Sequence, residues 1–147
     1  MKPFAFHTVL NYRKRLEDTA RQRLAEAKKA VDAVAKKLRE EQDALAALIH
    51  KKDLLQNEGI NIMELVLYEE QITRAQANIK AIEKNLLDKT EIMHQEQQHL
   101  LRRVKDRRIM ERLKERQDIA WKGYLDKKEL AMLDEIAITR HDSDKKY

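Results

Sequence analysis

The residues best suited to chemistry in this sequence are cationic side chains concentrated in one short segment. Residues 100–117 (LLRRVKDRRIMERLKERQ) hold eight basic and three acidic groups, so this segment alone accounts for the net charge of +5. Guanidinium and ammonium groups bind carboxylates and phosphates through charge and hydrogen bonds. The segment therefore predicts binding to an acidic partner surface, with a solvated helix face as the alternative interpretation. Its basic residues are Arg102, Arg103, Lys105, Arg107, Arg108, Arg112, Lys114 and Arg116.

Histidine and carboxylate groups do not show the spacing of a metal site. His94 and His99 are five residues apart, whereas two ligands on one helix face are three or four apart. His141, Asp142 and Asp144 bring ligand types together near the C-terminus, but a hydrophilic tail is the simpler interpretation. We therefore expect no metal site and surface positions for the histidines.

Catalytic and cofactor motifs are missing as well. The sequence contains no cysteine, which excludes disulfides, thiolate nucleophiles and cysteine-ligated metals. Gly59 and Gly123 are isolated, so they cannot build a glycine-rich phosphate-binding loop. We expect no catalytic residue and no cofactor, and we do not expect an enzyme.

The elements that position the basic segment are predicted to be long helices. Charged residues make up 39% of the chain and hydrophobic residues 42%, with only two glycines and one proline for turns. Beyond residue 61, apolar residues recur every seven positions, with others three or four positions away, as in a coiled coil. This series consists of Leu65, Ile72, Ile79, Leu86, Met93 and Leu100, with Tyr68, Ala75 and Ile82 between them. Residues 20–55 show the same spacing.

A helix-breaking segment, QNEGIN at 56–61, divides the two periodic stretches. Gly59 and the asparagines beside it tolerate the left-handed backbone that ends a helix, and helices joined by a short turn run antiparallel. We predict an all-α fold in which two long helices form an antiparallel coiled-coil hairpin, as one domain over 1–147. Its parts are helix one over about 7–56, a turn over about 57–61, helix two over about 62–138, and a frayed tail over 139–147.

The two periodic stretches agree on one pairing register. If the chain folds back at residue 60, facing positions sum to 120. The pattern then pairs Val34 with Leu86 in the middle of the hairpin, and Leu10 with Met110 toward its free end.

Near the free end the apolar spacing changes. In both helices the predicted core positions follow one another in consecutive steps of four residues, from Leu24 to Leu16 and from Glu96 to Val104, instead of alternating between three and four. Such breaks in the heptad repeat, called stutters, are predicted to unwind the supercoil locally at matching levels. Beyond them the same register pairs Tyr12 with Arg108, so the free end is expected to be more basic and less well packed. Helix one is too short to cover helix two beyond about residue 113, so the rest is expected to overhang.

Both ends of the sequence resemble one known family. FAFHTVLNYRKRLEDTARQRLAEA (4–27), VKDRRIMERLKER (104–116) and KKELAMLDEIAITR (127–140) are similar to the ends of the flagellar export protein FliJ family. The resemblance covers essentially the whole chain and includes the predicted hairpin. It implies a cytoplasmic, non-enzymatic component of the flagellar type III export apparatus, located at the inner face of the cell membrane and monomeric when free.

The resemblance also implies partners and contact residues. Members of the family are similar in shape to the central stalk of rotary ATPases; they insert their free ends into the export ATPase ring and escort export chaperones. Residues expected at the ring are Arg13, Arg102, Arg103, Arg107, Arg108, Leu130, Leu133, Asp134 and Glu135. The cytoplasmic domain of the export gate protein is expected to contact Ile49, Tyr68 and Gln71, of which only Tyr68 is the aromatic type that the family favours.

Three other interpretations stay open at this point. One is the equivalent stalk of a virulence type III secretion system. Another is a basic coiled-coil protein that binds nucleic acid, although only Tyr12 supplies an aromatic near the basic segment and basic zippers require a parallel dimer. The simplest is an inert structural spacer.

Overall fold

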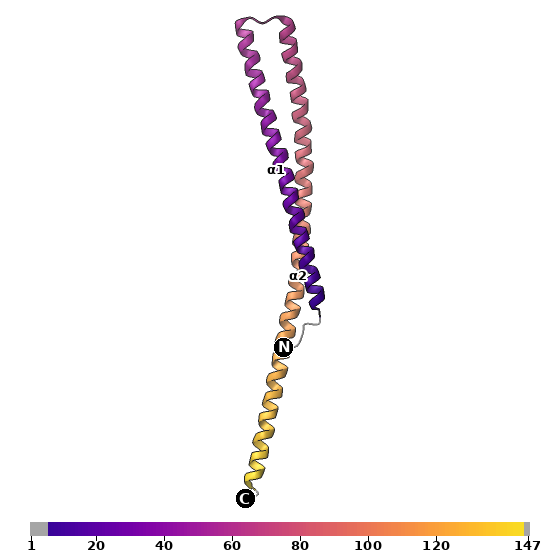
Figure 1. The fold of residues 1–147 in the computed structure, drawn as a ribbon, viewed down its shortest axis with the longest axis vertical. Helices are drawn as coiled ribbons and strands as arrows, with labels where there is room; N and C mark the ends of the chain where they lie inside the picture. Colours follow the sequence, from indigo (N-terminus) through magenta and orange to yellow (C-terminus); the bar gives the residue numbers. More distant parts are fainter. Residues whose placement is uncertain (1–5, 146–147) are drawn as a thin grey trace. The chain divides into compact units, whose positions relative to one another are not determined.

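The computed structural model describes residues 6–145, and nearly all of them are helical (Figure 1). Two long helices, α1 (His7–Glu58) and α2 (Ile62–Lys145), pack against each other as a helical hairpin, with no strand in the described part of the chain. The predicted fold class is therefore confirmed.

The helix ends differ slightly from the predicted ones. α1 continues to Glu58, and α2 runs to Lys145 instead of ending near residue 138. No glycine or proline interrupts residues 139–145, and the Thr139 hydroxyl donates to the Glu135 carbonyl oxygen at 2.8 Å. Lys145 adds a cation in the last turn, where the helix dipole favours one. Residues 146–147 of the predicted frayed tail, and the first five residues, lie outside the described part.

The connection between the helices is short and has its own stop and start signals. Gly59 has a φ of +92°, a left-handed conformation that glycine adopts at little cost, and its amide donates to the Gln56 carbonyl at 3.3 Å. Asn61 then caps α2, because its Oδ1 accepts from the Met63 amide at 3.2 Å. These two residues explain why the chain reverses at the predicted point.

Residues 19–101 form one compact unit. In it α1 and α2 pack along the apolar positions of the seven-residue repeat, which we call the seam. Figure 1 shows the antiparallel helices joined at one end. The residues on the seven-residue series are buried or half-buried, with Ile79 and Ile82 among the most buried at 8% and 6% exposure. The Lys52 Nζ lies 3.8 Å from Glu69 Oε1, and the fold-back register predicts that position 52 faces position 68, the neighbour of Glu69. The pairing register in this unit therefore agrees with the prediction.

Residues 6–18 and 102–145 form the second compact unit. Leu10 and Met110, at 2% and 4% exposure, form a buried apolar cluster, which confirms their predicted pairing. Tyr12 is 59% exposed and Arg108 is also exposed, so their predicted pairing is wrong.

The prediction failed because the heptad repeat continues without interruption through positions occupied by charged residues. One seven-residue series of α1 consists of Leu24, Val31, Leu38, Leu45 and Lys52. Its continuation toward the N-terminus gives Glu17 and Leu10, both buried. Continuing the series of α2 beyond Leu100 gives Arg107, which is half-buried. The predicted stutters are therefore wrong. Leu16 and Val104 are half-buried beside this seam, but the spacing of three and four continues through charged positions.

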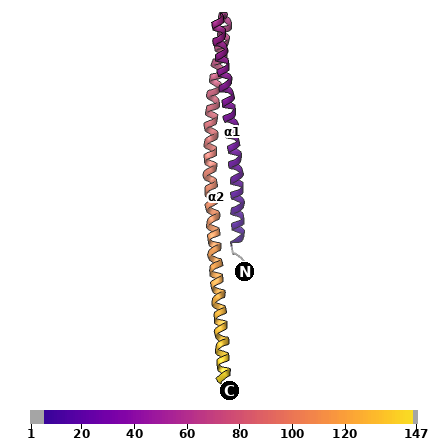
Figure 2. The ribbon, with the colours of Figure 1, turned by 90° about the vertical axis from the view of Figure 1, so that its left-hand side faces the viewer.

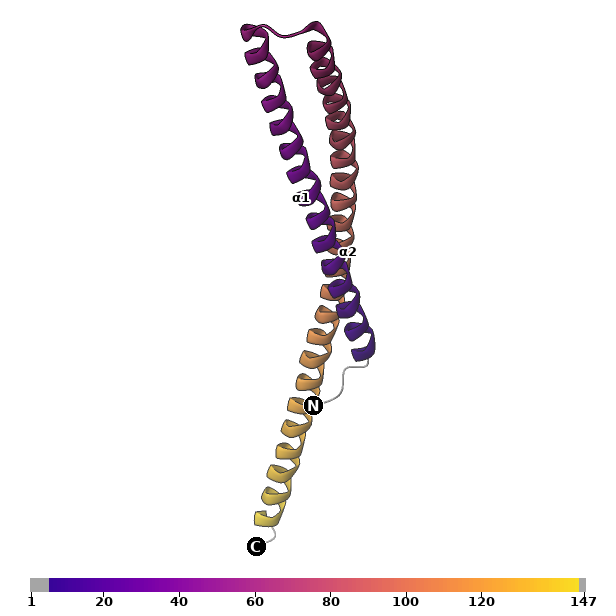
Figure 3. The same ribbon diagram turned by 45° about the horizontal axis from the view of Figure 1, so that its top comes forward.

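α2 continues as a single helix past the described start of α1, as Figures 2 and 3 show. Every residue from 122 to 145, which we call the C-terminal arm, is exposed. The overhang predicted beyond about residue 113 is therefore a mostly exposed helix, in which Gln117, Asp118 and Trp121 are half-buried. Trp121 stacks on Tyr124 with ring centroids 5.4 Å apart. Neither α1 nor α2, over its described length, is apolar enough to cross a lipid bilayer.

Candidate functional site

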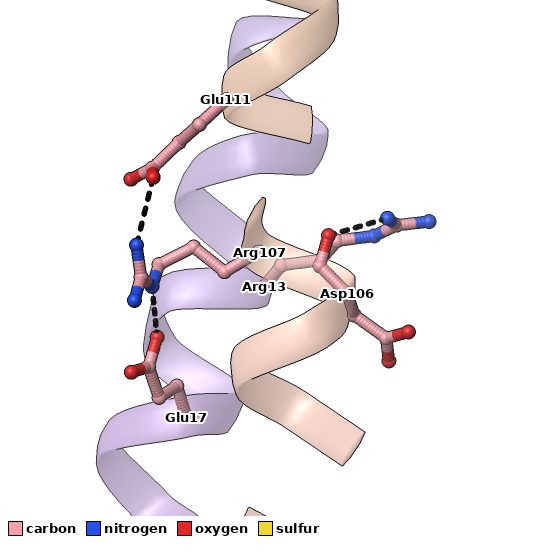
Figure 4. Close-up of polar contacts among 5 residues, drawn as sticks. All are labelled: Arg13, Glu17, Asp106, Arg107 and Glu111. Atoms are coloured by element: carbon pink, nitrogen blue, oxygen red, sulfur yellow. Dashed lines mark hydrogen bonds and ion pairs between the residues drawn. The ribbon is translucent and has the colours of Figure 1, made fainter. Parts of the chain in front are cut away.

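The most concentrated polar structure in the chain is a charged seam where α1 meets α2 within the second unit (Figure 4). Arg107 donates from Nε to Glu17 and from Nη1 to Glu111 Oε2, the latter at 2.8 Å. The Glu17 side chain is only 3% exposed and that of Arg107 is 21% exposed. A carboxylate can be buried this deeply because a guanidinium bonds to it directly.

These bonds stabilise the charged form of Arg107. The hydrogen bond to Glu17 raises the pKa of the Arg107 guanidinium above its usual value, and the bond to Glu111 raises it further. Burial acts in the opposite direction and is outweighed. Arg107 is therefore a permanent cation in the seam.

Arg13 forms a second link between the helices. Its Nη1 donates to the backbone carbonyl oxygen of Asp106 at 2.8 Å, and Arg13 is half-buried. The Asp106 carboxylate in turn lies 3.9 Å from Nη1 of Arg103, one turn earlier on α2. Arg13 and Arg107 thus hold the first turns of α1 against α2, from the two sides shown in Figure 4.

The structure separates the basic residues that the sequence grouped together. Arg13, Arg103 and Arg107 are half-buried and have partners within the chain. Arg102 and Arg108 are exposed on α2. Of these five arginines, Arg102 and Arg108 are the two without an ion pair or side-chain hydrogen bond in the described part of the chain, so their guanidinium groups are available to a partner.

Most of the other predicted contact residues are exposed. On the C-terminal arm, Leu130 and Leu133 are 61% and 55% exposed, and Asp134 and Glu135 are exposed too. In residues 19–101, Ile49 is 37% exposed and Gln71 is exposed.

Tyr68 differs from these exposed contact residues. It is half-buried and occupies a seam position, as its place in the heptad indicates. Packing in the seam therefore buries part of the Tyr68 side chain, and only the rest is available to a partner.

The residue that sequence reasoning missed is Glu17. A count of apolar residues passes over it because a carboxylate is rarely buried. The available signal was its position in the repeat, seven residues before Leu24, in the series that continues with Val31 and Leu38.

The remaining polar groups give no sign of another site. His94 is exposed, and its Nδ1 lies 3.1 Å from Gln97 Oε1 on the same helix. Among residues 6–145, no group of three or more histidine, aspartate or glutamate side chains has the arrangement that a metal ion needs.

Two long helices packed as a hairpin, with a charged seam and an exposed basic helix, define a helical-hairpin protein of the coiled-coil type. The family model described as Flagellar FliJ protein matches residues 1–146, so the chain belongs to the FliJ family. Members of this family are non-catalytic components of the flagellar export apparatus. Comparisons with curated proteins and with solved structures returned no match.

Proposed function

We propose that this protein is the central stalk of the flagellar export ATPase ring and an adaptor to the export gate and to export chaperones. The family assignment supports a place in the export apparatus. In this proposal the protein acts mechanically, because an asymmetric helix inside a ring biases the nucleotide states of the surrounding subunits. It works in the cytoplasm, next to the membrane that holds the gate.

The observation that carries the proposal is the C-terminal arm. All of residues 122–145 are exposed, yet the arm presents apolar side chains such as Leu130, Leu133 and Ile136, which are 61%, 55% and 48% exposed. A helix with apolar groups on its surface gains free energy when a partner covers them. Insertion into a ring would cover such a helix on all sides.

The contact residues in this proposal follow from exposure. Leu130 and Leu133 supply apolar contact, with Asp134 and Glu135 beside them. Arg102 and Arg108 supply exposed charge. Arg13 and Arg107 contribute indirectly, by holding the start of α1 against α2, whereas Arg103 pairs with Asp106 of its own helix.

The adaptor role is assigned to residues 19–101. Ile49 and Gln71 are exposed there and would contact the cytoplasmic domain of the gate protein, with Tyr68 contributing its accessible edge. Binding of the purified gate domain to Ile49→Asp, compared with the wild type, tests this assignment. Equal binding by both proteins would contradict it.

The stalk role is tested by stimulation of the purified cognate export ATPase. The variant Leu130→Asp/Leu133→Asp should lose the stimulation, because two charges replace the apolar contact, and should keep its helical content by circular dichroism. Leu87→Asp/Ile92→Asp is the matched control, since both residues are exposed on α2 outside the arm. Full stimulation by the arm variant would refute the stalk assignment, and a gel shift of DNA at low salt with no ATPase binding would favour a nucleic-acid binder.

A further inference from the structure

The basic residues of α2 fall into two sets that point in different directions. Arg103 and Arg107 lie on the seam side, where Arg107 bonds to Glu17 of α1. The other set, which we call the outward basic face, is exposed along its whole length. It comprises Arg102, Lys105, Arg108, Ile109, Arg112 and Arg116.

The outward basic face occupies a single side of the helix. At 3.6 residues per turn, its members fall within about 120° of the helix circumference and extend for about 21 Å along the axis. None of the four acidic residues of 102–120 falls in that sector. Asp106 and Glu111 lie on the other sides, where each contacts a seam arginine, and Glu115 and Asp118 also lie outside it. No ion pair within the described chain involves Arg102, Lys105, Arg108, Arg112 or Arg116.

This arrangement is unfavourable for the free protein. Arg108, Arg112 and Arg116 follow one another at intervals of four residues, so like charges are direct neighbours on the helix surface, which destabilises a helix. The seam half of the same segment shows the opposite arrangement, in which Arg107 is bracketed by Glu17 and Glu111. A partner with negative charge would relieve the repulsion on the outward face.

The composition of the face selects among acidic partners. A helix that lies in a lipid interface needs a broad apolar side, but this sector offers one isoleucine, Ile109 at 53% exposure, among five cations. Single-stranded nucleic acid needs aromatic side chains for base stacking, and the sector contains none. Regularly spaced cations around one exposed aliphatic group fit a protein surface that carries carboxylates around a small apolar contact.

We infer that the outward basic face is a docking surface for an acidic protein surface, and that the seam arginines do not take part in this contact. The inference rests on the proposed function in one respect: the export ATPase is the partner on which the surface is expected. It changes which residues carry recognition, because Lys105, Arg112 and Arg116 join Arg102 and Arg108, while Arg13, Arg103 and Arg107 are removed.

The test compares two fourfold charge reversals with the same change in net charge. The outward variant is Lys105→Glu/Arg108→Glu/Arg112→Glu/Arg116→Glu. The control variant is Lys28→Glu/Lys29→Glu/Lys37→Glu/Arg39→Glu, at exposed positions of α1 for which no ion pair is described. Affinity for the purified cognate export ATPase is measured from low to high salt, with vesicles of anionic phospholipid and single-stranded DNA as separate probes.

The outward variant should bind the ATPase about 100-fold more weakly at low salt, because attraction becomes repulsion, and its salt dependence should flatten. The control variant should bind like the wild type. Equal losses in both variants, or no loss in either, would overturn the inference while leaving the stalk role intact. Wild-type binding to vesicles or DNA but not to the ATPase would overturn both, and loss in Arg107→Gln equal to that in the outward variant would overturn the division between the two sets.

Discussion

Two stretches of the same heptad seam are stabilised in different ways. In residues 19–101 the seam is apolar, with Ile79 and Ile82 at 8% and 6% exposure. Where residues 6–18 meet α2 in the other unit, Leu10 and Met110 form the buried apolar cluster, and Glu17 and Arg107 take the neighbouring heptad positions. Apolar burial stabilises in proportion to the area removed from water, whereas an ion pair must first recover the cost of removing two charges from water. The comparison teaches that the same spacing can bury apolar side chains alone in one region and apolar side chains together with an ion pair in the other.

The largest expected effect comes from locking the apolar region covalently. We expect Val34→Cys with Leu86→Cys to form a disulfide within one chain and to stabilise residues 19–101 by about 4 kcal/mol, because a long loop is closed in the unfolded state. Non-reducing mass spectrometry and urea unfolding measure both effects. Cross-links that form only between chains would contradict the hairpin register.

The apolar seam can also be weakened at one residue. Ile82→Ala should lower the free energy of unfolding by about 3 kcal/mol, since it removes a buried side chain and leaves a cavity. Leu87→Ala is the matched control, because Leu87 is 71% exposed on the same helix and should change little. Equal effects of the two variants in urea unfolding would place the seam elsewhere.

A substitution in the charged seam should have a smaller effect on stability, mainly in the first turns of α1. Glu17→Ala removes the α1 partner of Arg107, leaves its bond to Glu111, and should cost about 2 kcal/mol, with faster amide hydrogen exchange in residues 7–18 than in residues 24–55. Uniform acceleration along α1 would show that the two regions do not differ in stability.

Placing apolar residues at heptad positions 17 and 107 provides the complementary test. Glu17→Leu with Arg107→Leu should recover the stability lost in Glu17→Ala, because well-packed apolar residues often match or exceed a buried ion pair. A double variant as unstable as Glu17→Ala would mean that the ion pair itself stabilises the seam.

The smallest expected effect concerns a glycine outside both seams. Gly123 lies within α2, and a Cβ placed there meets no atom within 4 Å. Gly123→Ala should therefore stabilise the C-terminal arm by up to about 1 kcal/mol, seen as slower hydrogen exchange in residues 122–145. Gly59→Ala provides the contrast, since the φ of +92° at Gly59 makes any side chain unfavourable there and should lower stability.

Sequence periodicity predicts the fold well where burial and hydrophobicity coincide. From Leu24 to Leu55 and from Leu65 to Leu100 the seam positions are mostly apolar, so a seven-residue count finds them. Gly59 is equally informative, because its left-handed backbone suits few other residues, and Asn61 supplies the cap that starts α2.

The candidate site is predicted less well, because charge does not reveal which way a side chain points. Arg107 and Arg108 are adjacent and identical in type, yet one is half-buried against Glu17 and the other is exposed. Apolar counting places the seam at Tyr12 and Arg108, whereas strict heptad counting leads to Glu17 and Arg107. Position within the repeat, rather than residue type, separates seam arginines from exposed ones.

The exposed C-terminal arm has a consequence for how the protein melts. No described segment packs against residues 122–145, so their helicity depends on intrinsic propensity and on contacts between successive turns. Such a helix–coil equilibrium shifts gradually with temperature instead of in one cooperative step. Thermal circular dichroism should therefore show a steep pre-transition slope, which a bound ring would flatten by holding the arm helical.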